Sequence, residues 1–453
     1  MSEVRRKVIW VGVVIAIALG VYALLPADMG EPARRAVGIG VLAAILWAIE
    51  IVPLFATSLA VVVLQIVLLS GLSDVQGKPM HYALFLDPLA SSTIILFLGG
   101  FLLAAAAGKH GLDAAIASRL LKPFLARPVR LVTAITFIGG FMGMWMSNTA
   151  TAAMMLAMVA PMLRDPKIDA KLAGAIALAC AFGPSLGSFA TPIATPPNAI
   201  TMAQLRAAGM DVSFLRWMLF GVPLSLGMLA IASAVICLVT RPTEDSALDP
   251  IRAPHKLSWQ AWATALAIGG AIVGWLTGPL HGMDDCVPAL LAAAALCILG
   301  VLDERDLRHI EWSVLILIWG GLALGQALAH TGVLEYVAQL PLFHHTGLAL
   351  AIVITIAGIT LSTFLSNTAT ANILVPLAVG LSTANDPRLA LVAGLSVTFA
   401  LALPVSSPPN AMAFATGKLK SRQMIVAGGI ISLIGLPAMV VGYVWVLPWA
   451  LGR

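Results

Sequence analysis

The polar pentapeptide Ser-Asn-Thr-Ala-Thr occurs twice in this sequence, at 147–151 and at 366–370. Each copy lies in a long stretch without Asp, Glu, Lys or Arg, at 131–163 and at 346–384. Ser, Asn and Thr favour helix N-caps. A helix that begins there directs free N–H groups and its positive dipole end at the tip, which suits an anion. Hydroxyl, amide and backbone carbonyl oxygens at the same tip are hard ligands suited to a cation such as Na⁺.

A second pair of motifs, Pro-Pro-Asn-Ala, follows the first pair at 196–199 and 408–411. Adjacent prolines remove two backbone donors and cannot lie inside a helix, so the spans 172–206 and 389–417 are predicted to be broken there. Carbonyls freed before each break can hold a cation, and the following half-helix, capped by the Asn of the motif, begins with unpaired N–H groups. The predicted structural breaks are at Pro196, Pro197, Pro408 and Pro409.

The composition is that of an integral membrane protein. Of its 453 residues 60% are hydrophobic and only 10% are charged, with a mean hydropathy of +0.98, against about 25% charged in a soluble domain. The net charge of +5 is accounted for by membrane topology, so no nucleic-acid partner is expected. The histidines lie in predicted loops, where metal ligation is not expected.

The fold class predicted is an all-α polytopic membrane protein with eleven transmembrane helices and two re-entrant helical hairpins. The hairpins are 131–163 and 346–384, of 33 and 39 residues. One helix of that length would overshoot a ~30 Å hydrocarbon core, whereas two full spans need about 40 residues and a turn. The predicted spans are 8–25, 33–49, 53–72, 91–107, 172–206, 217–240, 259–277, 288–302, 312–329, 389–417 and 424–449.

The distribution of basic residues predicts the orientation. With the N-terminus inside, the cytoplasmic segments contain 19 of the 26 Lys and Arg, as the positive-inside rule requires. The C-terminus is then outside.

The chain also contains an internal repeat. The segment 96–112 returns at 317–333, with Gly99, Gly100 and Gly111 matching Gly320, Gly321 and Gly332. Each copy is followed by one pentapeptide and one Pro-Pro-Asn-Ala motif. Five crossings separate the copies, and an odd number inverts them. Inverted repeats with broken helices at the midplane are typical of secondary transporters.

The absence of charged side chains from both hairpins and both breaks bears on the coupling ion. A proton-coupled carrier would normally have an intramembrane carboxylate or His, so the sequence favours a metal cation. A membrane-embedded enzyme would need a nucleophile with its base, or a metal cluster, and the sequence offers neither; no enzymatic activity and no organic cofactor are expected. An ion channel would need a continuous polar lining, which broken helices argue against.

With paired Ser-Asn-Thr motifs, each followed by a broken helix with Pro-Pro-Asn, the chain resembles the divalent anion:sodium symporters. These transport di- and tricarboxylates or, in some branches, sulfate. The resemblance covers nearly the whole chain in motif order and spacing. It implies a homodimer in which a scaffold holds two transport domains that move as elevators. The implied division is scaffold at 1–130 and 217–345 (with the joining loop 241–258), transport-domain halves at 131–216 and 346–423, and a last span at 424–453.

The resemblance also implies the site residues. The substrate would be held by Ser147, Asn148, Thr149, Thr195, Ser366, Asn367, Thr368 and Ser407. One sodium site would use Ser147, Asn148 and the backbone of Gly143 and Ala194. The other would use Ser362, Asn367 and the backbone of Leu365 and Ser406. Ser407 stands where the family has the Thr of Thr-Pro-Pro-Asn.

The function predicted is sodium-coupled symport of C4 dicarboxylates such as succinate, malate or fumarate, across a bacterial inner membrane. Na⁺ is the co-transported ion, and the other partners are the dicarboxylate, the lipid membrane and a second copy of the chain. The alternatives within the resemblance are a sodium-independent dicarboxylate exchanger and a sulfate or citrate transporter. An ion channel is a more distant alternative.

Overall fold

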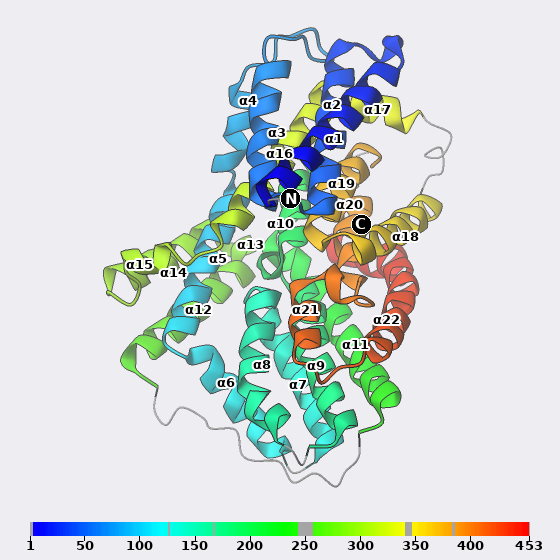
Figure 1. The fold of residues 1–453 in the computed structure, drawn as a ribbon. Coiled ribbons are helices and arrows are strands. Elements are labelled where there is room, and N and C mark those ends of the chain that lie inside the picture. The colour runs from blue at the N-terminus through cyan, green and yellow to red at the C-terminus, as the bar shows by residue number, and fades with distance from the viewer. Residues whose placement is uncertain are drawn as a thin grey trace. The chain divides into compact units, whose positions relative to one another are not determined.

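A computed structural model describes residues 3–125, 127–165, 168–242, 257–339, 347–382 and 386–452. These residues contain no β-strand, and their only extended pairing is an isolated bridge between Ser73 and Pro79. The all-helical prediction is therefore confirmed for the described part of the chain (Figure 1).

The chain folds into two compact units, each assembled from three segments. The first unit comprises Met1–Ile94, Ala199–Asp211 and Glu311–Val397, and the second Ile95–Asn198, Val212–Ile310 and Thr398–Arg453. Both units therefore combine residues from the two halves of the sequence.

The first unit contains α1 to α4, the body of α10 and α16 to α20. Their bounds are α1 Glu3–Leu24, α2 Glu31–Ile49, α3 Leu54–Leu69, α4 Ala83–Leu86, α10 Pro196–Ala207, α16 Trp312–His330, α17 Val333–Ala338, α18 Leu348–Phe364, α19 Asn367–Gly380 and α20 Arg388–Ser396.

The second unit contains the remaining α-helices, apart from the first three residues of α5, together with the first residues of α10. Their bounds are α5 Ser92–Lys109, α6 Leu112–Leu121, α7 Pro128–Gly143, α8 Asn148–Arg164, α9 Ala170–Gly187, α11 Phe214–Thr240, α12 Trp259–Leu276, α13 Gly278–His281, α14 Cys286–Ile298, α15 Glu304–Leu307, α21 Pro408–Ala415, α22 Ser421–Val441 and α23 Leu447–Leu451.

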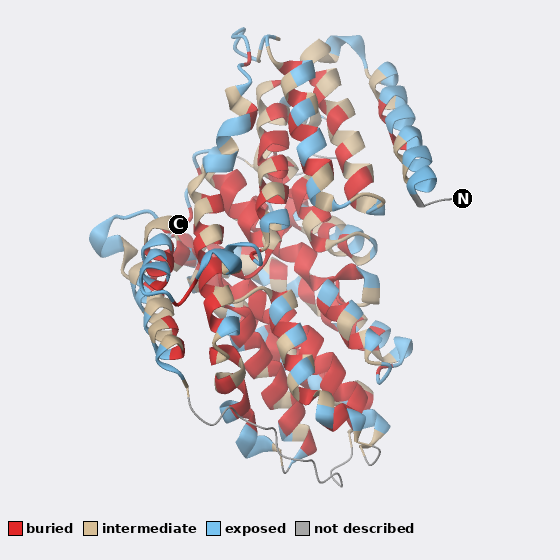
Figure 2. Ribbon diagram, turned by 60° about the vertical axis from the view of Figure 1, so that its left-hand side comes forward, coloured by how far each residue is buried: buried red, intermediate tan, exposed pale blue. Residues whose placement is uncertain are grey.

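Within the described ranges, eight helices are long and apolar enough to cross a membrane, and each coincides with a predicted span. Three further predicted spans correspond to the shorter helices α3, α14 and α20. Figure 2 marks the N-terminus at the end of helix α1. Of the 18-residue apolar stretch in α1 only 11% is buried, whereas the corresponding stretch that begins in α9 is 100% buried. An apolar helix exposed on this scale is suited to lipid. The total of eleven crossings stays a prediction.

Each pentapeptide begins the second of two consecutive helices, with its Ser as the N-cap. Helices α7 and α8 have 16 and 17 residues, and α18 and α19 have 17 and 14. At 1.5 Å per residue each is about 21–26 Å long, which is less than a ~30 Å hydrocarbon core. Each arm is thus shorter than the hydrocarbon core even when it stands along the membrane normal, as expected for a re-entrant hairpin. The predicted spans α3 and α14, of 16 and 13 residues, are equally short.

Both Pro-Pro pairs begin a new helix after an interruption, as predicted. Helix α9 is followed by the 3₁₀ turns Ser188–Ala190 and Pro192–Ala194 before α10 begins at Pro196. The chain from Val397 to Ser406 is likewise 3₁₀ or irregular before α21 begins at Pro408. Each break occurs because proline has no N–H to donate and its ring excludes a preceding helical turn.

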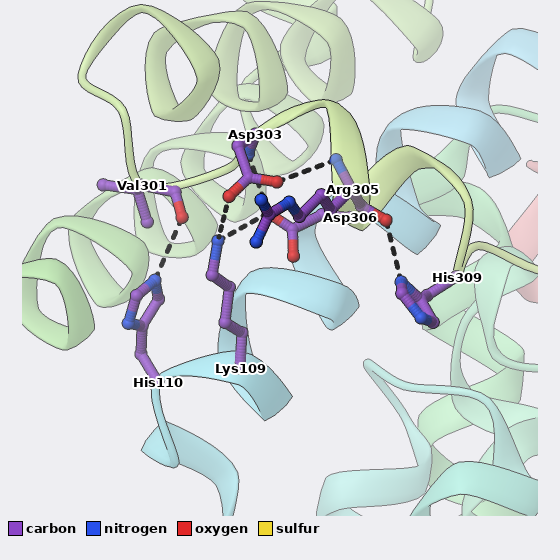
Figure 3. A network of polar contacts seen from close by, with 7 residues as sticks. All are labelled: Lys109, His110, Val301, Asp303, Arg305, Asp306 and His309. Carbon is purple, nitrogen blue, oxygen red and sulfur yellow. Dashed lines mark hydrogen bonds and ion pairs between the residues drawn. The ribbon is translucent and has the colours of Figure 1, made fainter.

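A polar network fixes the end of α5 (Figure 3). The Nζ atom of Lys109 lies 2.6 Å from Asp306 Oδ2 and 3.3 Å from Asp303 Oδ2. Asp303 and Asp306 also form a capping box at the start of α15. The backbone amide of Arg305, with the Lys109 ammonium after it, holds the pKa of the Asp303 carboxyl below its usual value. The network therefore joins the helix carrying the first Gly-Gly pair to the segment after α14.

Candidate functional site

The first tip, in the second unit, is the turn between α7 and α8. Ser147 is the N-cap of α8 and makes no side-chain cap bond, so its hydroxyl does not compete for the first amides of the helix. Asn148 is buried, and its Oδ1 accepts a hydrogen bond from Thr149 Oγ1 at 3.4 Å. The three predicted ligands Ser147, Asn148 and Thr149 are thus the N-cap and the first two residues of one helix.

The segment after α9 lies against this turn. A Cβ atom at Gly143 would stand 2.6 Å from the carbonyl oxygen of Pro184, so α7 and α9 touch through their backbones here. Thr191 donates a hydrogen bond from Oγ1 to the carbonyl oxygen of Met144. These contacts bring the backbone at Gly143 close to the 3₁₀ turn that ends at Ala194. The close approach explains why glycine stands at 143.

The Asn residues of the Pro-Pro-Asn motifs act differently from the prediction. We expected each Asn to cap its half-helix, but the N-cap of α21 is Ser407. Each Asn instead donates hydrogen bonds from Nδ2 to oxygens of the segment that precedes its half-helix. Asn198 Nδ2 donates to the carbonyls of Ser188 and Thr191, at 2.8 and 2.9 Å. Asn410 Nδ2 likewise reaches back to oxygens of the segment before α21. A side-chain amide carries two donors, so it satisfies carbonyls left without helical partners.

We expect Asn198→Asp to lower both melting temperature and transport. The substitution keeps the shape of the side chain but faces two carbonyl oxygens with a carboxylate. A buried hydrogen-bonded group that loses its partner costs about 1–3 kcal/mol. The melting temperature in detergent and uptake into proteoliposomes measure the effect, and an unchanged melting temperature would contradict this role of the amide.

Thr195 and Ser407 precede the two proline pairs in nearly identical backbone conformations. Their φ and ψ angles are −156° and 148° for Thr195, and −153° and 151° for Ser407. Extended backbone of this kind is what a following proline favours. Both side chains are buried, and Ser407 Oγ has no hydrogen-bond partner among the described residues. A buried hydroxyl without a partner is costly unless a ligand or water completes it.

In the second unit, α21 packs against α8 and α9. The half-helix that follows Ser407, from the second half of the sequence, therefore lies beside the helix that begins at the first tip. In the first unit, a Cβ atom at Gly394 would stand 1.8 Å from Thr201 Oγ1, so the body of α10 lies against α20. Each half-helix therefore packs against helices from the other half of the sequence: α10 against α20, and α21 against α8 and α9.

The second tip, in the first unit, joins α18 to α19. Ser366 is the N-cap of α19, and its Oγ accepts a hydrogen bond from the amide of Ala369 at 3.3 Å. Ser362 Oγ donates to Asn367 Oδ1 at 2.7 Å, and both residues are buried. Leu365 is extended, with a φ of −112° and a ψ of 167°, and ends α18. Thr368 is half-buried one residue into α19.

The predicted site residues include no titratable group. What the two tips offer is a set of hydroxyl, amide and carbonyl oxygens, together with helix N-termini. Oxygen ligands suit a hard monovalent cation, and N-termini suit a carboxylate or another small anion. The predicted ligands Ser406 and Ser407 lie in the second unit, whereas Ser362, Leu365 and Asn367 lie in the first.

Sequence reasoning missed Thr191 as a residue that holds the tip. Its signal was weak, because one Thr in an apolar stretch usually bonds to the carbonyl four residues before it. The hydroxyl of Thr191 instead bonds 47 residues away, to Met144.

Residues 44–394 of the chain match the family model described as citrate transporter. The chain belongs to the citrate transporter family. As a member of it, the chain is an integral membrane transporter with several apolar helices.

Two curated relatives align with most of this citrate transporter family member. An uncharacterized transporter of Haemophilus influenzae is 30% identical over 415 residues, covering 86% of this chain and 87% of the relative. The sodium-dependent dicarboxylate transporter SdcS of Staphylococcus saprophyticus is 27% identical over 486 residues, covering 98% of this chain and 92% of that protein. The resemblance stated from the motifs is thereby confirmed.

A solved structure shares the fold of this family member. The YdaH transporter of Alcanivorax borkumensis aligns with a TM-score of 0.53 at 11% sequence identity, covering 89% of this chain and 99% of the other. At that identity the likeness concerns the fold alone.

Proposed function

We propose that this protein is a sodium-coupled symporter of C4 dicarboxylates such as succinate, malate or fumarate. The observation that carries the proposal is the second tip, where Ser362 Oγ and Asn367 Oδ1 lie 2.7 Å apart at the start of α19. Two uncharged oxygens beside a helix N-terminus suit a sodium ion and a carboxylate together. The name of the relative SdcS supports the same substrate and ion.

Charge balance supports sodium as the coupling ion. Moving a negative charge into a cell against an inside-negative potential costs about 2.3 kcal/mol per charge for each 100 mV. Two Na⁺ ions that enter with a dianion neutralise its charge and remove that cost. A third makes the transported charge positive, so that the membrane potential then favours entry. Neither hairpin contains an Asp, Glu, Lys or Arg that could exchange a proton instead.

The finer architecture belongs to the same proposal. We assign the two tips to re-entrant hairpins of an inverted repeat, with the predicted transport halves moving as an elevator against the predicted scaffold. The protein would work as a homodimer in the inner membrane of a bacterial cell, with no enzymatic activity. In each pair, two arms shorter than the hydrocarbon core meet at an uncharged polar turn, and this combination supports the hairpin assignment.

Uptake of labelled succinate into proteoliposomes tests the proposal. We expect an inward Na⁺ gradient to drive accumulation, and an equal gradient of choline to leave only background. Accumulation that persists without Na⁺ but requires dicarboxylate inside the vesicles would make the protein an exchanger instead.

Citrate is the second candidate substrate, because the matching family model is described as a citrate transporter. Sulfate stays an alternative, since helix N-termini bind any small anion. Competition of each unlabelled anion against labelled succinate ranks them. Succinate, malate and fumarate should compete more strongly than citrate or sulfate.

A further inference from the structure

The second unit contains a cavity of about 230 Å³ bounded by α5, α6, the end of α7 and α12. Its walls are mainly apolar, with contributions from Leu103, Ile116, Met142 and Ile268. Asp113 is the one titratable residue among those that line it, all of which the structure describes. We call this space the Asp113 cavity.

Asp113 is the second residue of α6 and is only 8% exposed. Its Oδ1 accepts a hydrogen bond from the backbone amide of Ala114 at 2.7 Å. Burial raises the pKa of its carboxyl, and the influences opposing that rise come from backbone amides, not from a side-chain cation in the described part of the chain. A buried carboxylate without a cationic partner is costly, so a ligand that supplies the positive charge would be stabilised there.

Two tryptophans line the same cavity. Trp275, on α12, is held in place because its ring stacks on Phe214, with centroids 4.2 Å apart, and its Nε1 donates to the carbonyl of Asp285 at 2.8 Å. Trp145 belongs to the turn between α7 and α8. Indole rings attract ammonium groups through their π faces more strongly than the other aromatic side chains do. The cavity therefore combines one acid, two indoles and an apolar wall.

We propose that the Asp113 cavity binds an organic ammonium ion with a small apolar body, whose positive charge pairs with the Asp113 carboxylate. An anion is excluded because its charge would meet a carboxylate of the same sign. A neutral apolar molecule would fill the volume but leave the carboxyl unpaired. An occupant of the cavity would touch Trp145 and Met146, the two residues that precede Ser147.

Equilibrium dialysis of the purified full-length protein in detergent tests the proposal, with radiolabelled benzyltrimethylammonium as the probe. We expect saturable binding that Asp113→Asn weakens about tenfold or more, since it removes the opposite charge but keeps the shape. Glu304→Gln is the matched control, because it removes one carboxylate whose side chain is 86% exposed. That control should bind as the unmodified protein does.

A second variant keeps the test decisive if Asp113→Asn folds poorly. Gly269 also lines the cavity, and a Cβ atom there would meet nothing within 4 Å. Gly269→Leu should therefore fold normally, fill the cavity and abolish binding of the probe.

Three results would overturn the proposal. They are no saturable binding by the unmodified protein, equal binding by the folded Asp113→Asn variant, and equally strong binding of neopentylbenzene, the neutral isostere of the probe. Dialysis measures binding directly, so the outcome does not depend on which anion the protein transports.

Discussion

Alanine at Asn148 or at Asn367 should reduce sodium-driven succinate uptake roughly 10- to 100-fold, the effect expected when a hydrogen bond to a charged ligand is lost. Each residue is the first of the helix that follows a tip, and each side chain is buried. In the proposed function each supplies an amide group to the carboxylate and an oxygen to sodium. Loss of Asn367 also leaves Ser362 Oγ without the acceptor that lies 2.7 Å away.

The control is the hydroxyl next to Ser362. Thr363 Oγ1 donates to the carbonyl of Ile359 in its own helix at 2.7 Å, so it satisfies only the backbone. Thr363→Val should retain near-normal uptake, whereas Ser362→Ala should raise the sodium concentration needed for half-maximal uptake. Melting temperature and gel-filtration profile establish that each variant is folded. Near-normal transport by both Asn→Ala variants would refute the site.

Gly428→Ala should destabilise the protein by about 3 kcal/mol and abolish transport, because backbone cannot move aside as a side chain can. A Cβ atom at Gly428, on α22, would lie 2.3 Å from the carbonyl oxygen of Leu401. That oxygen already accepts a hydrogen bond from Asn410 Nδ2 at 3.2 Å. The substitution therefore displaces the irregular segment that leads to Ser406 and Ser407. The measurement is the melting temperature in detergent, together with succinate uptake.

The neighbouring glycine provides a matched control. A Cβ atom at Gly429, in the same helix, would meet nothing within 4 Å. Gly429→Ala should leave stability unchanged or raise it by as much as about 1 kcal/mol, the helix-propensity gain of Ala over Gly. Equal melting temperatures of the two variants would contradict the close packing of α22 on Leu401.

Features that depend on local chemistry were predictable from the sequence. The helix starts at Asn148 and Asn367 follow from N-cap preferences, and those at Pro196 and Pro408 from the missing proline N–H. The local argument failed for Asn198, whose amide donates to carbonyls seven and ten residues earlier instead of capping its helix. Capping would need the side-chain oxygen of Asn198 to accept from backbone N–H groups at the helix end, but Asn198 is the third residue of α10. The two carbonyls left without helical partners instead take the amide N–H groups and so orient the side chain away from the helix end.

By itself, the sequence determined that this is a helical membrane protein with two uncharged polar tips and two proline breaks, because each depends on composition or on neighbouring residues. Only the tertiary structure decided that α21 lies beside α8, that Thr191 holds the turn at Met144, and that Asp113 lines the same cavity as two tryptophans. Those pairings join residues tens to hundreds of positions apart. They depend on which helices pack together, and a periodic apolar pattern cannot distinguish one apolar partner from another.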